Sequence, residues 1–257
     1  MPPADASAEP DAAPDDQGPA APPGGRAVGA GVEDTLDLKL TEELLALIAQ
    51  QRDPEPRDVR AARPAPGDEL LGDPGAWPPA ATGAGEFRLL PVRPERDLAL
   101  LSRWMNDPAV AAFWELAGPE SVTAEHLGRQ LEGDGRSIPC LGVLDGAPMS
   151  YWEIYRADLD PLARHYPARP HDTGLHLLIG GVENRGRGVG ATLLRAVADL
   201  VLDNLPRCGR VVAEPDLRNT PSVSAFLSAG FRFSAEVDLP DKRAALMMRD
   251  RPYRAHL

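Results

Sequence analysis

The pattern of apolar and polar residues is most regular in the second half of the chain. Apolar residues surround His176 in a run with the composition of a strand, and from Val189 to about Asp203 they recur at helical spacing. The later segments predict four more elements: a strand at 210–213, a helix at about 220–229, and strands at 231–238 and 243–248. The predicted order is therefore strand, helix, strand, helix, strand, strand.

The ends of the second predicted helix are marked by residues with known preferences. Asn219 or Thr220 can cap its start, and Pro221 falls in its first turn. Gly230 follows its last turn and suits the positive φ with which many helices end. These signals place the helix between its two flanking strands.

A glycine-rich turn joins the strand around His176 to the first predicted helix. Arg185, Gly188 and Gly190 form the pattern R-x-x-G-x-G there. The first turn of the helix would present free backbone N–H groups and the positive end of a dipole, and glycines let phosphates approach closely. The G-x-x-x-x-G-K-[ST] loop is absent, and the glycine spacing is wrong for a dinucleotide fingerprint. The turn predicts a pyrophosphate site, with a tight turn bearing two exposed arginines as the structural alternative.

Composition divides the chain into two parts. The net charge is −12 over 257 residues, but residues 1–85 hold 16 acidic and 6 basic residues, against 23 and 21 in the remainder. Fourteen of the 28 prolines precede residue 80. Such a segment buries too little apolar surface to offset the entropy of ordering it. We expect residues 1–85 to be a disordered tail with one short amphipathic helix near 35–51, and residues 86–252 to form the single domain.

Several classes of protein are disfavoured by the sequence. No basic segment precedes an apolar stretch at the N-terminus and no apolar run approaches the length of a membrane span, which predicts a cytoplasmic protein. The near-neutral charge balance after residue 85 argues against nucleic acid as a partner. Two cysteines are too few for a disulfide framework, and no metal site is expected. The cysteines and the other histidines are not spaced along the sequence as metal ligands usually are; they are Cys140, Cys208, His126, His165, His171 and His256.

Five segments resemble the siderophore-biosynthesis acyltransferases, a family that includes the mycobactin lysine N-acyltransferase and the aerobactin hydroxylysine acetyltransferase. In chain order they are residues 103–114, 151–155, 172–180, 212–221 and 236–247. The strand, glycine turn and helix are similar to the acyl-CoA site of the GCN5-related N-acetyltransferase fold. The resemblance covers about residues 87–250. It implies an α/β (α+β) domain with a mixed, splayed sheet flanked by helices.

Carried over residue by residue, the resemblance implies that His176 is the general base and that Asp216 is its acidic companion. It also implies that coenzyme A lies on the strand, the glycine turn and the start of the first helix, with Asn219 contributing from the start of the second helix. The implied binding residues are Leu178, Ile179, Gly180, Arg185, Arg187, Gly188, Val189, Gly190 and Asn219. A neutral imidazole suits this chemistry, because an amine must be uncharged to attack a thioester. Strand alternation places His176 and Leu178 on one face.

Other interpretations of these residues stay open. His176 could be a core histidine with satisfied hydrogen bonds, and Asp216 could simply form the turn after Pro215. Many acetyltransferases carry a proton-donating tyrosine seven residues after the motif asparagine, but this chain has Phe226 there. Protonation of the leaving thiolate would then fall to Asp216, to water or to the imidazolium.

A candidate acceptor pocket precedes the strand of His176. Tyr151, Glu153 and Tyr155 share one face of a predicted strand, and Glu153 could hold a substrate cation. Aromatic residues on a half-buried strand are usually packing, which is the favoured interpretation for Trp152 on its other face. The early aromatics Trp104, Phe113 and Trp114 are likewise interpreted as core anchors.

The resemblance implies transfer of an acyl group to the terminal amine or N-hydroxyamine of lysine or a similar diamine or amino acid, in siderophore biosynthesis. The donor would be acyl-CoA, including acetyl-CoA, or the phosphopantetheine of an acyl carrier protein. Pathway enzymes are further expected partners. Three alternatives remain: an acetyltransferase of another amine such as an antibiotic, a non-catalytic acyl-CoA-binding module, and a protein whose tail carries its biology.

Overall fold

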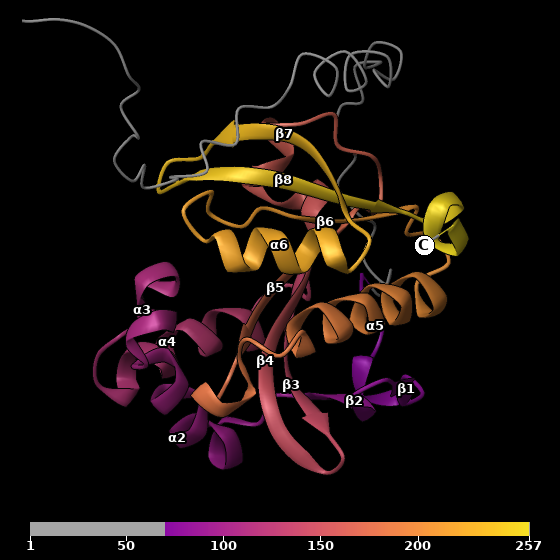
Figure 1. Ribbon diagram of the computed structural model, residues 1–257. Coiled ribbons are helices and arrows are strands. Elements are labelled where there is room, and N and C mark those ends of the chain that lie inside the picture. Colours follow the sequence, from indigo (N-terminus) through magenta and orange to yellow (C-terminus); the bar gives the residue numbers. More distant parts are fainter. Residues whose placement is uncertain (1–69, 257) are drawn as a thin grey trace, which may run out of the picture. The chain divides into compact units, whose positions relative to one another are not determined.

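The computed structural model describes residues 70–256, which form a mixed eight-stranded sheet with helices on both faces (Figure 1). The strand order is β1-β2-β3-β4-β5-β6-β8-β7. Neighbouring strands are antiparallel except β5 and β6, which are parallel. The strands are β1 (Ala80–Thr82), β2 (Gly85–Pro91), β3 (Ser137–Leu144), β4 (Ala147–Arg156), β5 (Thr173–Ile179), β6 (Arg210–Ala213), β7 (Arg232–Asp238) and β8 (Arg243–Asp250).

The helices cover the two faces with separate apolar clusters. The α-helices are α2 (Pro94–Met105), α3 (Pro108–Trp114), α4 (Glu120–Leu131), α5 (Val189–Asn204) and α6 (Thr220–Ser228). Short 3-10 turns are η1 (Pro74–Ala76), η2 (Ala157–Leu159), η3 (Pro161–Arg164), η4 (Val182–Asn184) and η5 (Arg251–His256). Helices α5 and α6 pack on the face that holds Trp152 and Leu175, whereas α2, α3 and α4 pack on the face that holds Tyr151 and Leu178.

The predicted order of elements from β5 onward is confirmed. Helix α5 begins at Val189 as expected, and Asn219 caps α6 by accepting a hydrogen bond from the Ser222 N–H at 3.2 Å. Gly230 has a φ of +88°, a conformation that favours glycine after a helix. Trp104 and Trp114 contribute to the cluster under α2 and α3, as their interpretation as core anchors requires, but Phe113 is 38% exposed, so its interpretation as a core anchor is wrong.

The predicted start of the domain at residue 86 is too late. Leu71 is 1% exposed and belongs to the core cluster beneath α5. Strand β1 pairs with β2, so residues that were assigned to the tail extend the sheet by one strand. Because the surrounding sequence is rich in proline, its composition did not indicate that Leu71 and the three residues of β1 belong to the domain. The rest of the predicted tail, with its helix near 35–51, lies outside the described residues.

No helix in the described range 70–256 combines the length and the apolar character needed to cross a lipid bilayer.

The parallel pair β5 and β6 separates soon after it begins. Only Thr173 and Gly174 have ladder partners on β6, namely Val211 and Val212. Beyond Gly174, β5 continues to Ile179 while β6 ends at Ala213. The expected splay of the sheet is therefore present at this point, and it leaves one edge of β5 without a strand partner from Leu175 onward.

Gly174 is required where the splay begins. A Cβ at this position would lie 2.0 Å from the ring of Tyr155, its cross-strand partner on β4. Such a contact is impossible for a real side chain, so only glycine lets the ring lie flat across β5. The Tyr155 hydroxyl thereby reaches Glu214, which directly follows β6, and donates a hydrogen bond to its Oε2 at 2.7 Å.

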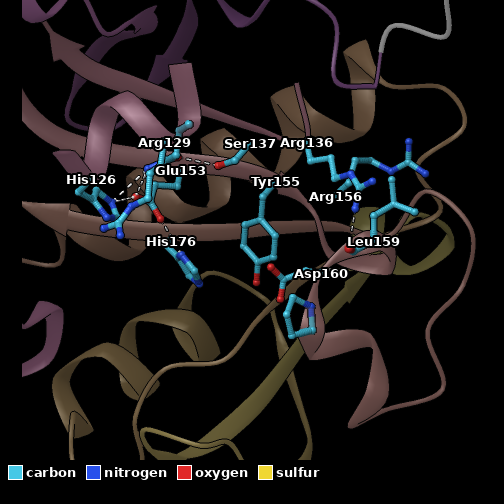
Figure 2. A pocket seen from close by; sticks show the side chains of 12 residues that line it. His126, Arg129, Arg136, Ser137, Glu153, Tyr155, Arg156, Leu159, Asp160 and His176 are labelled. Atoms are coloured by element: carbon cyan, nitrogen blue, oxygen red, sulfur yellow. Dashed lines mark hydrogen bonds and ion pairs between the residues drawn. The ribbon is translucent and has the colours of Figure 1, made fainter. Parts of the chain in front are cut away.

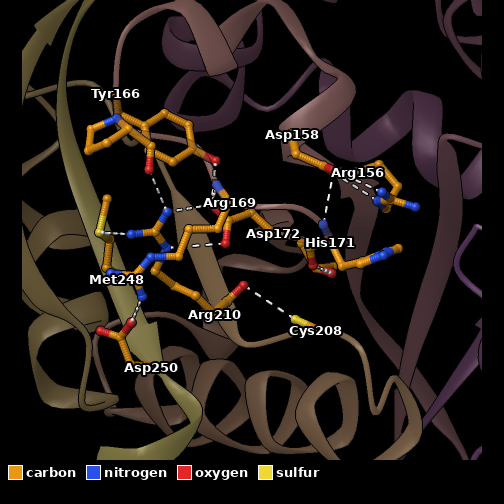
Figure 3. A network of polar contacts seen from close by, with 12 residues as sticks. Arg156, Asp158, Tyr166, Arg169, His171, Asp172, Cys208, Arg210, Met248 and Asp250 are labelled. Carbon is orange, nitrogen blue, oxygen red and sulfur yellow. Dashed lines mark hydrogen bonds and ion pairs between the residues drawn. The ribbon is translucent and has the colours of Figure 1, made fainter. Parts of the chain in front are cut away.

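A buried ion pair joins β5 and β6 where they are still together (Figure 3). Arg210 and Asp172 are 2% and 1% exposed, and Arg210 donates two hydrogen bonds to the Asp172 carboxylate. The Tyr166 hydroxyl donates a third at 3.1 Å, and its ring lies 5.4 Å from the guanidinium carbon of Arg210. Because desolvated charges are tolerated only when paired and hydrogen-bonded, this network fixes the two strands to each other.

We predict that Asp172→Asn lowers the free energy of unfolding by about 3–5 kcal/mol, because it leaves the buried Arg210 charge without its counter-ion. Urea denaturation followed by circular dichroism measures the change. Asp238→Asn is the matched control: its side chain is 91% exposed and 3.8 Å from Arg243, so a change of about 0.5 kcal/mol or less is expected. Equal effects for the two variants would contradict a stabilising role for the buried ion pair of Asp172 and Arg210.

Candidate active site

His176 lies on β5 next to the point where the sheet splays. Its cross-strand partner on β4 is Glu153, and Leu178 belongs to the cluster on the same face, as strand alternation predicted. Leu175 and Leu177 pack on the opposite face with α5 and α6. Tyr151 and Tyr155 share the face of Glu153, so the candidate acceptor residues surround His176, as Figure 2 shows in part.

Two buried carboxylates hold the His176 ring from both sides. Its Nδ1 is 2.9 Å from Glu153 Oε2, and its Nε2 makes a very short contact with Glu214 Oε1. The Tyr155 ring lies against the imidazole, with centroids 4.7 Å apart and the ring planes tilted by 38°. The His176 side chain is nevertheless 36% exposed, whereas those of Glu153 and Glu214 are 8% and 6% exposed. The ring is fixed in orientation and still open to a ligand.

The carboxylates are themselves held by a wider network. Glu153 Oε1 lies 2.5 Å from His126 Nε2 and accepts hydrogen bonds from Gln130 at 2.7 Å and the Tyr151 hydroxyl at 2.9 Å. Glu214 accepts from the Tyr155 hydroxyl, and Lys242 Nζ lies 3.7 Å from its Oε1. Each carboxylate therefore has a hydrogen-bonding partner besides His176.

Charge pairing dominates the protonation of this group. Burial alone would lower the pKa of His176, but the negative charge of Glu214 and the hydrogen bonds from both carboxylates outweigh it and raise the pKa to about 10. Burial alone would raise the pKa of Glu214 and Glu153, yet the neighbouring histidines lower both, that of Glu214 to about 2. At neutral pH and without ligand, His176 is an imidazolium between two carboxylates. The neutral imidazole expected from the sequence is thus not the resting state.

The predicted pairing of His176 with Asp216 is not formed. The Asp216 carboxylate instead accepts hydrogen bonds from the Arg218 backbone N–H and guanidinium, at 2.6 to 3.1 Å. The reason is strand geometry: Glu214 follows β6 directly and points at His176, whereas Asp216 lies two residues further, in the turn. Asp216 still lines the same cavity as His176, so its role in the reaction stays a prediction.

Two cavities meet at His176. The first, named the β4 cavity, has a volume of about 460 Å³ and is bordered by β4, α4 and the segment around Asp160 (Figure 2). The second, named the β5–β6 cleft, has a volume of about 320 Å³ and is bordered by the splayed strands, α6 and Lys242. His126, Glu153 and His176 line both. The ring is therefore accessible from two sides.

Of the predicted cofactor residues, Asn219 lines the β5–β6 cleft, and the others lie at the end of β5, in the turn that follows and at the start of α5. Gly186 and Gly188 both have a φ of +74°. Helix α5 starts at Val189, and because its N-cap residue is Gly188, no side chain caps its first N–H groups. Its first backbone N–H groups thus point outward for a ligand. A Cβ at Gly190 would lie 3.8 Å from Ile179, an ordinary contact, so packing alone does not require this glycine.

The two arginines of the turn differ. Arg185 is tied to the fold, donating to the Ile179 carbonyl at 3.1 Å and to Asp107 at 3.0 Å, whereas Arg187 is exposed. Gly180 is required by packing, because a Cβ there would lie 2.2 Å from the Trp104 ring. Leu178 is buried in the core and Asn219 caps α6 at the edge of the cleft. Of the predicted set, Arg187 and the helix start are thus best placed for phosphates.

Sequence reasoning missed two residues of this site. Glu214 belongs to the same E-P-D turn as Asp216. Its position directly after the predicted strand 210–213 was the feature of the sequence that could have indicated a contact with His176. His126 comes from α4 and meets Glu153 only through the fold, which no spacing in the sequence could show. Among residues 70–256, no group of three or more histidine, cysteine or acidic side chains is arranged to hold a metal ion.

Comparison with known proteins agrees with this geometry. Residues 93–239 match the family model described as the acetyltransferase (GNAT) domain. Lysine N-acyltransferase MbtK of Mycolicibacterium paratuberculosis is 40% identical over 156 residues, which cover 61% of this chain and 70% of that protein. The N(6)-hydroxylysine O-acetyltransferase of Escherichia coli is 40% identical over 158 residues, covering 62% of this chain and 50% of that protein.

Among solved structures, an uncharacterized protein of Bacillus halodurans has a TM-score of 0.66 and 33% identity, covering 72% of this chain and 95% of that one. The family match spans α2 to the end of β7 and includes His176, the whole lining of the β4 cavity, and the lining of the β5–β6 cleft except Asp241 and Lys242. The chain belongs to the GNAT acetyltransferase family.

Proposed function

We propose that this protein transfers an acyl group from acyl-CoA to the terminal amine or N-hydroxyamine of a lysine-like substrate. The observation that carries the proposal is the position of His176 at the junction of two cavities, one for each substrate. The names of the relatives, a lysine N-acyltransferase and a hydroxylysine O-acetyltransferase, support the acceptor class. The siderophore pathway implied by the sequence resemblance is the proposed context.

The β5–β6 cleft is the proposed donor site. The unpaired edge of β5 offers backbone N–H and C=O groups that the amides of a pantetheine arm can bind as a strand would. The start of α5 then receives the pyrophosphate through its free N–H groups and dipole. Backbone N–H groups of the same edge can stabilise the oxyanion that forms on the thioester carbonyl. An acyl carrier protein would present the same arm.

The β4 cavity is the proposed acceptor site. It ends at Glu153 and His176, where a nucleophilic nitrogen can approach the thioester in the neighbouring cleft. The nitrogen lone pair attacks the thioester carbon, a C–N bond forms and the C–S bond breaks. His176, once neutral, accepts the proton that the nitrogen loses. The imidazolium that results lies beside the departing thiolate and neutralises its charge, which Phe226 cannot do.

We predict that His176→Ala lowers kcat for thiol release by about a hundredfold to ten-thousandfold, because the proton acceptor is lost. Affinity for coenzyme A should change little, since the helix start and the β5 edge are intact. Thiol release from acetyl-, succinyl- and long-chain acyl-CoA with lysine, N6-hydroxylysine, ornithine and cadaverine measures the first effect. Calorimetry with coenzyme A measures the second.

His165→Ala is the matched control, because His165 is exposed and lies outside both cavities. It should retain the wild-type kcat. Normal coenzyme A binding without thiol release by the wild-type protein, for every amine in the panel, would contradict the proposed reaction and favour a non-catalytic acyl-CoA-binding module.

We also predict that acceptor basicity sets the pH dependence. Two protons must leave before lysine reacts, one from His176, whose pKa is raised to about 10, and one from the ε-ammonium, whose ordinary pKa is about 10.4. Between about pH 7 and 9, log kcat/KM should therefore rise with a slope of about two for lysine and about one for N6-hydroxylysine, which is already neutral.

Initial rates at low substrate concentration across this pH range give the two slopes. In His176→Ala the residual slope for lysine should fall to about one, because only the substrate still titrates. A wild-type slope of one for lysine would contradict the resting imidazolium.

A further inference from the structure

We infer that the β4 cavity is built for an α-amino acid and that Arg136 binds its carboxylate, so that the acceptor is a free lysine-type amino acid and not a simple diamine. This inference rests on the proposed function, because it takes the His176 end of the cavity as the place where the side-chain nitrogen reacts.

Charged side chains lie at both ends of the β4 cavity. Glu153 and His176 lie at one end, and Arg136 lies at the other, beside Leu159, with Tyr155 between them (Figure 2). Asp160 lies near Tyr155 on the lower wall. A zwitterion with a distant second nitrogen matches this pattern, because it carries one carboxylate and one ammonium next to each other at the end remote from the reacting nitrogen.

Only some of the cavity's arginines are available to an anion. Arg156 is 7% exposed, and its Nε and Nη2 each donate a hydrogen bond of 2.8 Å to Asp158, so burial and this pairing leave little of its guanidinium for an anion. Arg136 is 43% exposed; its Nε meets Asp134 at 2.6 Å and its Nη1 reaches the Leu159 carbonyl at 3.4 Å. Its Nη2 makes no hydrogen bond within the described chain. A surface pair such as Arg136 with Asp134 contributes little and leaves the guanidinium able to receive a carboxylate.

Arg129 is a poorer candidate. It lies on α4 three residues after His126, close to the reacting end, and faces Glu125 at 3.6 Å on the helix surface. A carboxylate bound there would place the α-carbon of lysine where its side-chain nitrogen must be. The geometry therefore favours Arg136.

The distance between the two ends fits lysine. The Arg156 N–H donates to the Arg136 carbonyl, so Arg136 lies opposite Arg156, three residues along β4 from Glu153. Three residues of strand span about 10 Å. Six bonds of about 1.5 Å join Nζ of lysine to its carboxyl carbon, which gives roughly 7–8 Å when extended. One hydrogen-bond length at the carboxylate closes the remaining gap.

Asp160 supplies the partner for the α-ammonium. Its Oδ1 accepts the Leu162 N–H at 2.9 Å, which fixes the side chain at the start of η3. Its Oδ2 makes no hydrogen bond within the described residues and borders the cavity. An α-amino acid would thus be bound through both of its backbone charges, whereas cadaverine, with the same chain length and no carboxylate, would lose the Arg136 contact.

The test compares L-lysine with cadaverine in the full chain, with acetyl-CoA as donor. Wild-type kcat/KM should be about tenfold to a hundredfold higher for lysine, the effect of one charged hydrogen-bonding contact. Arg136→Ala should lower kcat/KM for lysine by that factor, mainly through KM, and leave cadaverine unchanged. Arg88→Ala is the matched control, because Arg88 is 49% exposed and pairs with Glu86 two residues before it, as Arg136 pairs with Asp134.

Three results would overturn the inference: equal kcat/KM for lysine and cadaverine in the wild type, an unchanged ratio in Arg136→Ala, or a loss of the lysine preference in Arg129→Ala instead. Equilibrium dialysis with labelled lysine separates this inference from the proposed reaction. If no amine releases thiol but lysine binds and Arg136→Ala abolishes that binding, the carboxylate site stands and the proposed reaction fails. If thiol is released without preference for lysine, the reaction stands and the carboxylate site fails.

Discussion

The site depends on β5 and β6 being held together at one end and separated at the other. The buried pair of Asp172 and Arg210 fixes the strands at the start of β5, and the ladder between them ends at Gly174. Because His176 lies two residues past that point, its ring faces a cleft and not a neighbouring strand. A longer ladder would pair the edge of β5 with β6 and close the cleft. The stability given by the Asp172–Arg210 pair and the accessibility of His176 therefore follow from the same arrangement of strands.

Electrostatics then gives this histidine an unusual resting state. A ring between two buried carboxylates keeps its proton, since the attraction to Glu153 and Glu214 exceeds the desolvation that burial imposes. His176 and its two carboxylates together carry one net negative charge, and because Lys242 lies 3.7 Å from Glu214, the Glu153 side is the one suited to receive a cation. An approaching ammonium adds positive charge, which lowers the pKa of His176 and favours release of its proton. In the proposed reaction, binding of a cationic substrate would therefore also favour the neutral form of His176 that accepts the proton.

The sequence predicted local features well and features formed by tertiary contact poorly. Periodicity and helix-end residues such as Asn219 gave β5 to β8 with their helices, because these signals lie within a few neighbouring positions. The sequence also predicted the glycine turn and the face of the strand on which His176 lies. The pairing of His176 with Glu214 was not, since two acids stand two residues apart in one turn and only the end of β6 decides which one points inward. His126 joins the site from α4, a separate helix, and the first strand was hidden by the proline-rich composition before it.

Phe226 bears on how the leaving thiolate is stabilised in the proposed reaction. Phe226 is 2% exposed, borders the cleft and packs against Phe231 with ring centroids 5.0 Å apart, so this position serves the core and cannot supply a proton. A thiol has a pKa of about 8.5 by analogy with cysteine, below the value of about 10 for His176. With the ligand-free pKa of His176, the thiolate would be a weaker base than the imidazole, and in the proposed reaction it would leave as an anion beside the imidazolium. In the proposed reaction a proton-donating tyrosine would therefore add little, because the positive charge of His176 would stabilise the thiolate.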